Sequence, residues 1–498
     1  MPQINGFPIL TPEAAVAGLK HGDTVSFSGF TPAGAAKVVP RALADRARGE
    51  HRVGREFKVR VLTGASSGQV IDDELAEAES VAWRAPYQSG AAMRRQINAG
   101  SVEYVDMHLS HVPQAAQFGF FGRIDLAVVE ATEVTGDGRV FLTTSIGASP
   151  TYLQCAERVV IEINRRQSPR LREMADILVL PPPPHRTPIQ IYDPLGRIGV
   201  PYAVVDPRKI AGVVENDIPD DVAPFSEPDE KGRRIADHVV DFLLHEMHCG
   251  RIPSGFLPLQ AGVGNVANGV LAALGAHPQI PPFKMYSEVY QDAMVDLMLA
   301  GKLLGASATA LAITTEKLRE VVDRIDFFSR RIVLRPQEIS NHPGIIRRLG
   351  VVAMNTALEA DIYGNVNSSH LYGSHIVNGI GGSGEFTRNS YLSIFMAPSI
   401  AKAGRISTIV PMVPHVDSNE HSVQILVTEQ GLADLRGLGP MQRARAIIDR
   451  CAHPDYRGYL DDYLARSRPG HIRHDLGRCF ELHRNLMETG AMLPGKGS

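Results

Sequence analysis

Residues 283–298 read Phe283-Lys-Met-Tyr-Ser-Glu-Val-Tyr-Gln-Asp-Ala-Met-Val-Asp-Leu-Met298, and the rest of the chain can be interpreted outward from them. The half-apolar run 283–286 predicts a strand, and the apolar spacing from Val289 onward predicts a helix that ends near Gly301. Glu288 therefore lies at a strand-to-helix turn, which in an open α/β sheet is the edge where ligands bind. Its carboxylate is either a nucleophile or base, or an acid that only stabilises the first helical turn.

Strand patterns alternate with helical patterns along the whole chain. Residues 25–34 predict a strand followed by a glycine turn, 35–47 a helix, and 58–62 and 124–129 two further strands. Such alternation is typical of βαβ units and of parallel sheets. We therefore predict an α/β protein with open, mainly parallel sheets.

The length of 498 residues is too great for one hydrophobic core, so more than one domain is expected. Prolines and acids dominate 215–230, which carries no apolar period and is typical of a linker. We accordingly predict one domain at 1–220 and a second at 221–498.

The second half has features of a diverged copy of the first. Four residues recur 226 positions later in the chain: Glu133, Gly138, Val140 and Gly147 match Glu359, Gly364, Val366 and Gly373. At the same offset Glu288 falls opposite 62–64, which contains no acid. The sequence thus predicts a structural duplication with the chemistry confined to the second copy.

Composition excludes several classes of function. The chain is 44% hydrophobic and 21% charged with a net charge of −3, so nothing in its charge favours nucleic acid or an anionic membrane. No apolar run approaches the ~20 residues of a membrane span, and the first residues resemble neither a signal nor a transit peptide. Four widely spaced cysteines without a CxxC pair indicate reduced thiols and a cytoplasmic protein.

Two glycine loops are candidates for close approach to a ligand. Gly262-Val-Gly-Asn-Val-Ala-Asn-Gly269 precedes a predicted helix at 270–274, so its backbone N–H groups could hold a phosphate, a carboxylate or an oxyanion. It also fits a dinucleotide loop, with Glu288 as the ribose-binding acid, or a purely structural tight turn. Asn378-Gly-Ile-Gly-Gly-Ser-Gly-Glu-Phe386 is a denser loop whose glycines indicate positive φ or a closely approaching ligand.

Three further candidates have simple structural alternatives. Lys402 could pair with a phosphate or be merely solvated, and Glu429 follows the predicted strand 424–427, where it could be a capping acid. His245-Glu-Met-His-Cys249 lacks the spacing of a zinc motif, and its histidines suit the last turn of a helix. We therefore expect no metal site.

Several of these motifs, in this order, resemble the acetyl-CoA hydrolase/transferase family, a branch of the class I coenzyme A transferases, and within it the succinyl-CoA:acetate CoA-transferases. The resemblance covers nearly the whole chain. It rests on the motifs at 28–31, 204–209, 262–266, 287–292, 340–343, 378–386 and 428–431. Val266 and Glu385 stand where the family usually has isoleucine and aspartate, which are conservative differences.

The resemblance implies two similar α/β domains with the active site between them, and a homodimer. It implies that Glu288 is the nucleophile, that the backbone N–H groups of Val266 and Gly382 stabilise oxyanions, and that Asn341 orients the reacting groups. It further implies that Gly262, Val263, Gly264, Asn265, Val266, Asn378, Gly382 and Lys402 contact coenzyme A, and that Glu429 shapes the acyl pocket. Coenzyme A is then a substrate, partnered by short-chain carboxylic acids, and no metal or redox cofactor is needed.

The favoured function is transfer of coenzyme A between a short-chain acyl-CoA (succinyl, acetyl or propionyl) and a free carboxylate such as acetate or succinate. The first alternative is an acyl-CoA hydrolase of the same family, in which water replaces the acceptor acid. A nicotinamide-dependent oxidoreductase is the second, but it leaves the loop 378–386 without a role. A non-catalytic acyl-CoA sensor is the third, and the presence of Glu288 argues against it.

Overall fold

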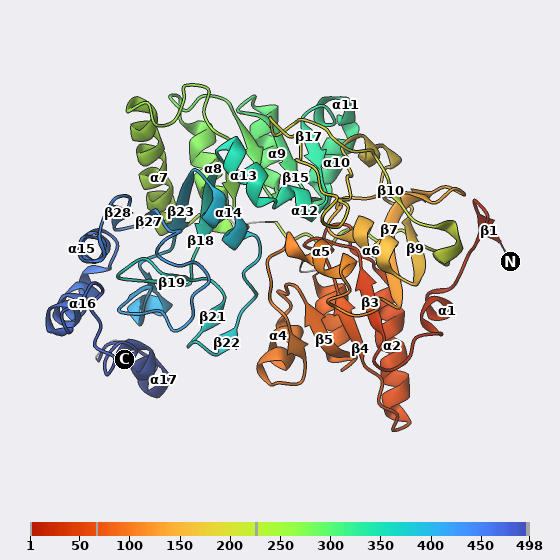
Figure 1. The fold of residues 1–498 in the computed structure, drawn as a ribbon, viewed down its shortest axis with the longest axis horizontal. Helices are drawn as coiled ribbons and strands as arrows, with labels where there is room; N and C mark the ends of the chain where they lie inside the picture. Colours follow the sequence, from red (N-terminus) through yellow and green to blue (C-terminus); the bar gives the residue numbers. More distant parts are fainter. Residues whose placement is uncertain (1, 66–67, 225–227, 495–498) are drawn as a thin grey trace.

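A computed structural model describes residues 2–65, 68–224 and 228–494 of the chain. Two large β-sheets, each built mainly of parallel strands and flanked by helices, form the two halves of the molecule (Figure 1). The predicted α/β class with two similar open, mainly parallel sheets is confirmed. Among the described residues no helix is both long enough and apolar enough to cross a membrane.

The first sheet comes from residues 24–216. Its seven parallel strands lie in the order β6-β5-β4-β3-β7-β9-β11. At one side β8 pairs antiparallel with β7, and β10 pairs antiparallel with β8. The bounds are β3 Thr24–Phe27, β4 Val59–Leu62, β5 Val81–Ala85, β6 Glu103–Tyr104, β7 Leu126–Val134, β8 Arg139–Leu142, β9 Arg158–Asn164, β10 Ala203–Val204 and β11 Ile210–Asn216.

The second sheet comes from residues 259–434. Its seven parallel strands lie in the order β17-β15-β13-β12-β18-β23-β27, and β28 closes one edge antiparallel. The bounds are β12 Leu259–Ala261, β13 Phe283–Tyr286, β15 Leu303–Ala308, β17 Ile332–Leu334, β18 Val352–Thr356, β23 Leu392–Met396, β27 Ile425–Thr428 and β28 Gly431–Asp434.

The parallel strands of the two sheets have the same order. In each sheet the first parallel strand of the chain lies in the middle, and the second, third and fourth follow it in order toward one edge. The hairpin register repeats as well. Glu133 pairs with Phe141 between β7 and β8, and Glu359 pairs with Asn367 between β19 (Glu359–Asp361) and β20 (Val366–Asn367). Both members of the second pair lie 226 residues after those of the first, so the predicted duplication and its offset hold at this hairpin.

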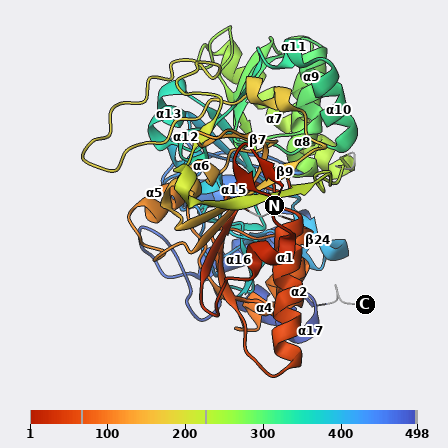
Figure 2. The same ribbon diagram turned by 90° about the vertical axis from the view of Figure 1, so that its right-hand side faces the viewer.

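Helices cover both sheets. The long helix α2 (Val38–Arg52) lies beside α1 (Pro12–Val16) on the outside of the first half (Figure 2). The other helices of this half are α3 Glu74–Glu77, α4 Ala91–Asn98, α5 His111–Gln117 and α6 Ser149–Cys155. The second half contains α7 Glu230–His248, α8 Asn265–Ala276, α9 Asp292–Leu299, α10 Thr315–Asp323, α11 Ile325–Phe328, α12 Gln337–Ser340, α13 Pro343–Leu349, α14 Ser383–Asn389, α15 Pro440–Arg450, α16 Pro454–Arg466 and α17 Glu481–Thr489.

The halves share one hydrophobic core. Met174 and Leu334 belong to the same buried cluster, and the Leu334 N–H donates to the Met174 carbonyl at 2.8 Å. Asp176 of the first half forms a fully buried ion pair with Arg335 of the second. Removing either charge would leave the other buried and unpaired, at a cost of about 3–5 kcal/mol. The two sheets are therefore one packed body, and the division at 220/221 stays a prediction.

Three element predictions were wrong in their bounds. Val289 and Tyr290 form a short strand, β14, and α9 begins only at Asp292, because β-branched and aromatic residues favour extended backbone. The first-half helix begins at Val38 rather than at 35, since the Glu162 carboxylate accepts the N–H groups of residues 37–39 and caps it there. Helix α8 begins at Asn265, earlier than the predicted 270.

The predicted linker is more ordered than its composition suggested. Glu215 and Asn216 are the last residues of β11, and the Asp220 carboxylate lies 2.9 Å from the Lys37 ammonium. Residues 225–227 of the predicted linker, and residues 66–67 of the turn after β4, lie outside the described residues. All four cysteines are free thiols, as the sequence predicted.

Candidate active site

A pocket of about 320 Å³ lies between the two halves and is lined by both. The first half contributes Phe30, Thr31, Ala65, Tyr87, Ser89 and Leu109, and the second contributes Gly262, Val263, Glu288, Asn378 and Gly382 among others. The carboxyl ends of β4 and β13 both lead into it, as expected for a ligand site in an open α/β sheet. The first copy thus contributes to the pocket lining, while no acid follows β4 at residues 63–65.

Glu288 occupies the turn between β13 and β14. Its backbone carbonyl accepts a hydrogen bond from the Thr309 N–H at 2.7 Å, which fixes the turn against the neighbouring strand. Its side-chain Oε2 accepts from the Asn341 Nδ2 at 2.8 Å. Burial raises the pKa of the Glu288 carboxyl to about 7, while hydrogen bonds from Asn341 and from the Gly382 backbone act in the opposite direction. A carboxylate so poised can act as a nucleophile near neutral pH.

Asn341 connects Glu288 to a second acid. Its Nδ2 also donates to the Glu385 Oε2 at 3.2 Å, and its own Oδ1 accepts from the Ser340 hydroxyl at 2.7 Å. The Ser110 N–H of the first half donates to the other Glu385 oxygen at 2.6 Å. Burial is the main cause that raises the pKa of Glu385 to about 8, and the charge of Glu288 adds to it. The two carboxyls and the amide thus form one network that spans both halves.

Gly382 lies against the Glu288 carboxylate. A Cβ atom on Gly382 would lie 1.9 Å from the Glu288 Oε2, so no side chain fits there. Gly382 lacks the positive φ that was one of the two predicted reasons for glycine in this loop: its φ is −86°, and it caps the N-terminus of α14. The positive φ falls on Gly381, at 56°.

The loop 378–382 is held by the first half. The Asp106 carboxylate accepts the Ile380 N–H at 2.9 Å and 3.0 Å, and the Tyr104 hydroxyl donates to the Asn378 carbonyl at 2.8 Å. Asn378 also hydrogen-bonds the Tyr87 side chain. Burial raises the pKa of the Asp106 carboxyl to about 7. Residues of the first half therefore set the position of the loop that touches Glu288.

The first glycine loop lies at the pocket mouth. Gly262 and Val263 line the pocket, and half of the Val263 surface is exposed. Gly264 has φ 134° and caps α8, so Asn265 and Val266 lie in the first helical turn. Backbone N–H groups in the first turn of a helix have no intrahelical acceptor and can bind an anion.

Two predicted residues lie apart from this pocket. Lys402 is exposed, with φ 50°, at the start of a 3₁₀ turn, Lys402–Gly404. Glu429 is buried at the end of β27, where its carboxylate accepts both the N–H and the hydroxyl of Ser399, at 2.7 Å and 2.5 Å. Burial alone would raise the pKa of Glu429, but these hydrogen bonds outweigh it and hold the pKa below its usual range. Among the described residues, the pocket lining includes neither of them.

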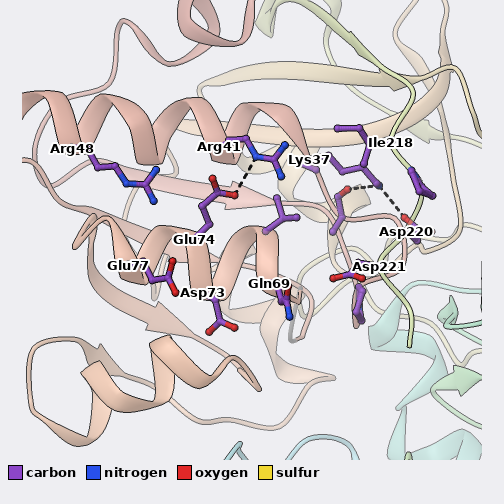
Figure 3. Close-up of a pocket in the computed structure, with 15 residues that line it drawn as sticks. Lys37, Arg41, Arg48, Gln69, Asp73, Glu74, Glu77, Ile218, Asp220 and Asp221 are labelled. Carbon is purple, nitrogen blue, oxygen red and sulfur yellow. Dashed lines mark hydrogen bonds and ion pairs between the residues drawn. The ribbon is translucent and has the colours of Figure 1, made fainter. Parts of the chain in front are cut away.

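A larger hollow, of about 630 Å³, lies beside α2 and is lined by charged side chains (Figure 3). Several of these charges are already paired: Arg41 lies 3.3 Å from Glu74, and buried Lys37 contacts Glu130 and Asp220. The hollow shares Pro32 with the Glu288 pocket. The buried cation of this hollow is therefore already paired with acids of the protein.

Sequence reasoning missed the contributions of the first half. Tyr87, Ser110 and Asp106 carry no local signal, because they act only through contacts with residues more than 200 positions away. The sequence resemblance marks Glu385 only as a conservative difference, although an acid next to a dense glycine loop is itself a signal for a site residue.

Known proteins resemble the chain over nearly all of its length. Residues 8–215 match the acetyl-CoA hydrolase/transferase N-terminal domain, and residues 316–464 match the C-terminal domain. A propanoyl-CoA:succinate CoA transferase of Escherichia coli is 54% identical, covering 97% of this chain and 98% of that protein. A succinyl-CoA:acetate CoA-transferase of Clostridium kluyveri is 44% identical, covering 97% and 90%. An acetyl-CoA hydrolase of Schizosaccharomyces pombe is 43% identical, covering 97% and 96%.

Solved structures share the fold. RipA from Yersinia pestis superposes with a TM-score of 0.70 at 24% identity, over 91% of this chain and 96% of that one. In the sequence, Glu288 and the loop 262–266 lie outside the two matched ranges. Their inclusion in the candidate site therefore rests on the contacts described above.

Proposed function

The chain belongs to the acetyl-CoA hydrolase/transferase family and is an enzyme, and on that premise we propose that it transfers coenzyme A between a short-chain acyl-CoA and a free carboxylate. The observation that carries this proposal is the Glu288 carboxylate. It lies in a pocket between the halves, with hydrogen-bond donors on its oxygens and a pKa near neutrality. A carboxylate in that setting suits covalent catalysis on a thioester.

In the first proposed step an oxygen of Glu288 attacks the thioester carbonyl carbon. The resulting tetrahedral oxyanion collapses, the carbon–sulfur bond breaks, and CoA leaves as a thiolate. The product on the enzyme is a mixed anhydride of the acyl group and Glu288. Raising the pKa of Glu288 toward 7 by burial also raises its basicity, which favours attack, while leaving a large ionised fraction at neutral pH.

In the second step the CoA thiolate attacks the Glu288 carbonyl carbon of the anhydride. The first acid leaves as a carboxylate, and CoA remains attached to Glu288 as a thioester. An acceptor carboxylate then repeats the two steps in reverse order and leaves with CoA. No proton or electron is gained or lost overall, so the cycle requires no redox cofactor. None of the steps as proposed uses a metal ion.

Hydrogen-bond donors for this cycle are well placed. When thiolate attacks the Glu288 carbonyl, the negative charge develops on a Glu288 oxygen, and the Asn341 amide and the Gly382 N–H already donate to the oxygens of this carboxylate. Such preorganised donors are worth about 10²–10³ in rate each. We propose Val266 and Gly382 as the oxyanion donors and Asn341 as the orienting residue.

The remaining assignments follow the same proposal. Coenzyme A would enter past Gly262, Val263, Gly264 and Asn265 and contact Asn378 in the pocket. The end of coenzyme A that stays outside would reach Lys402, which lies apart from the pocket. Glu429 would influence the acyl side indirectly through Ser399. We propose that the acyl groups are short, which is compatible with a pocket of about 320 Å³. We also propose a homodimer, which light scattering would test, and a cytoplasmic site of action.

A hydrolase is the alternative that several relatives support, because the Schizosaccharomyces pombe protein and others at about 40% identity are named acetyl-CoA hydrolases. The deciding experiment incubates the enzyme with acetyl-, propionyl- or succinyl-CoA, with and without acetate or succinate, and separates the CoA esters by chromatography. The transferase predicts new acyl-CoA only when an acceptor is present. Release of free CoA at a comparable rate without acceptor would instead identify a hydrolase.

A further inference from the structure

Two histidines and an aspartate meet beside the pocket wall. His370 begins β21 (His370–Leu371), and His415 and Asp417 lie between β26 (Ile409–Val410) and β27. One potential ligand atom from each lies within 4.8 Å of the other two. We propose that His370, His415 and Asp417 form a binding site for one divalent transition-metal ion such as Zn²⁺, contrary to the sequence-based expectation of no metal site.

The donor set is the first argument. Two imidazole nitrogens and one carboxylate oxygen are ligands that Zn²⁺ accepts, and three protein ligands leave a fourth position for water or another ligand. The imidazole rings have centroids 3.8 Å apart, and the His415 Nε2 lies 3.2 Å from the Asp417 Oδ1.

The charge on Asp417 is the second argument. Its side chain is only 4% exposed, and among the described residues its ion-pair partner is His415. Neither a lysine nor an arginine of the described part forms an ion pair with it. Among the described residues this nearly buried carboxylate pairs with an imidazole and with no lysine or arginine, and a divalent cation would supply a permanent positive charge there.

The surrounding hydrogen bonds orient the ligands. The Ser369 hydroxyl lies 2.7 and 2.8 Å from the two Asp417 oxygens and 2.8 Å from the His370 Nδ1. If that hydroxyl donates to Asp417, it accepts from His370 Nδ1–H, which leaves the His370 Nε2 lone pair free for a metal. The Ser368 N–H also donates to Asp417, at 2.6 Å. Hydrogen bonds from neighbouring groups to the ligand side chains are typical of metal sites in proteins.

The backbone joins the two segments that carry the ligands. The Val366 N–H donates to the Ser418 carbonyl at 2.8 Å, and the Asp417 N–H donates to the Val366 carbonyl at 2.9 Å. The three ligands are therefore held together before any ion arrives. Ser368, next to this site, also lines the Glu288 pocket. An ion bound here would therefore stabilise the segment that contributes Ser368 to the pocket lining.

The test uses the full chain, stripped with EDTA and dialysed, and titrated calorimetrically with Zn²⁺; Co²⁺ absorption reports the coordination geometry. The variants are His370→Ala, His415→Ala and Asp417→Asn. His421→Ala is the matched control, because His421 lies in the same loop with an 80% exposed side chain. His245→Ala is a second control, since His245 lies 3.6 Å from the Cys249 sulfur and could bind Zn²⁺ independently.

The proposal expects one Zn²⁺ per chain, a tetrahedral Co²⁺ spectrum, and at least a roughly tenfold weaker affinity in each of the three site variants. Both controls should bind as the wild type does. If the wild type does not bind, or if His245→Ala removes the binding while His370→Ala retains it, the proposed site is wrong. Circular dichroism of each variant confirms folding. If a site variant does not fold, the Co²⁺ spectrum of the wild type, its Zn²⁺ stoichiometry and the binding by the two control variants still test the proposal.

Discussion

The side-chain nitrogen of Asn341 lies 2.8 Å from an oxygen of Glu288 and 3.2 Å from an oxygen of Glu385, so one amide group joins two acids. Its two N–H bonds can serve one carboxylate each. Two carboxyls this close resist simultaneous ionisation, which raises at least one of their pKa values. Glu385 has the higher pKa, about 8, and Glu288 has a pKa of about 7. Near neutral pH this arrangement favours the proton on Glu385 and makes Glu288 the more ionised of the two acids.

The first prediction concerns pH. Because a nucleophilic Glu288 must be ionised and its pKa is raised to about 7, kcat/KM for acyl-CoA should fall as pH drops below about 7. An ordinary glutamate would keep the rate constant down to about pH 5. The profile is measured from pH 5 to 9 in constant ionic strength. A rate that stays flat from pH 5 to 7 would contradict the assignment of the pKa to the nucleophile.

The second prediction concerns Asn341. Its hydrogen bond lowers the pKa of Glu288, so Asn341→Ala should move the acidic limb of the pH profile upward and lower kcat by roughly 10–100-fold. Asn341→Asp adds a like charge and should move the limb further still. A lower kcat with an unmoved limb would mean that Asn341 acts on the fold and leaves the Glu288 charge unaffected.

The third prediction concerns Gly382. In Gly382→Ala the new Cβ would collide with the Glu288 carboxylate, so turnover should fall by about 10²–10³. Gly458→Ala is the control, because Gly458 lies in α16 without a positive φ, and a methyl group there would have no neighbouring atom within 4 Å. Both proteins are compared by thermal unfolding as well as by rate. Full activity of folded Gly382→Ala would remove this residue from the site.

The fourth prediction concerns Lys402. If its exposed ammonium pairs with a CoA phosphate, Lys402→Ala should raise KM for acyl-CoA more than it lowers kcat, and added salt should have a similar effect on the wild type. Lys20→Ala, at an exposed lysine of the first half, is the control. A pure kcat defect with unchanged KM would contradict the proposed contact.

The sequence was sufficient for the fold class and for the strand that ends before Glu288, because apolar runs and periods are local signals. The duplication offset was also readable, and the repeated hairpin register bears it out. The start of α9 was predicted too early, since Val289 and Tyr290 pair with β16 (Ala310–Leu311), and no local pattern reports that pairing.

The site was only partly predictable for the same reason. Glu288, Asn341 and Gly382 meet in the structure, but the network that sets their charge also needs Glu385 and Ser110. Ser110 lies 275 residues from Glu385 in the chain, and its role appears only when the two halves pack together. Glycine at 382 was predicted for its conformational freedom or for a closely approaching ligand, whereas the structure requires it for the space that Glu288 fills.

The central claim is that Glu288 carries CoA as a thioester. The direct measurement incubates the enzyme with acyl-CoA and no acceptor, adds borohydride, and maps the modified peptide by mass spectrometry. Borohydride reduces a thioester to an alcohol, so the modification inactivates the enzyme permanently. Glu288→Gln tests the charge with the shape retained, and Glu288→Asp tests the reach, since a carboxylate withdrawn by about one methylene should react far more slowly.

The account predicts that the reduced residue is Glu288, that inactivation requires acyl-CoA, and that Glu288→Ala shows neither the modification nor transfer. Glu429→Gln serves as the control and should still be modified at Glu288. Transfer of CoA by the Glu288→Ala enzyme, or a modification that maps to Glu429 or Glu385, would contradict the account.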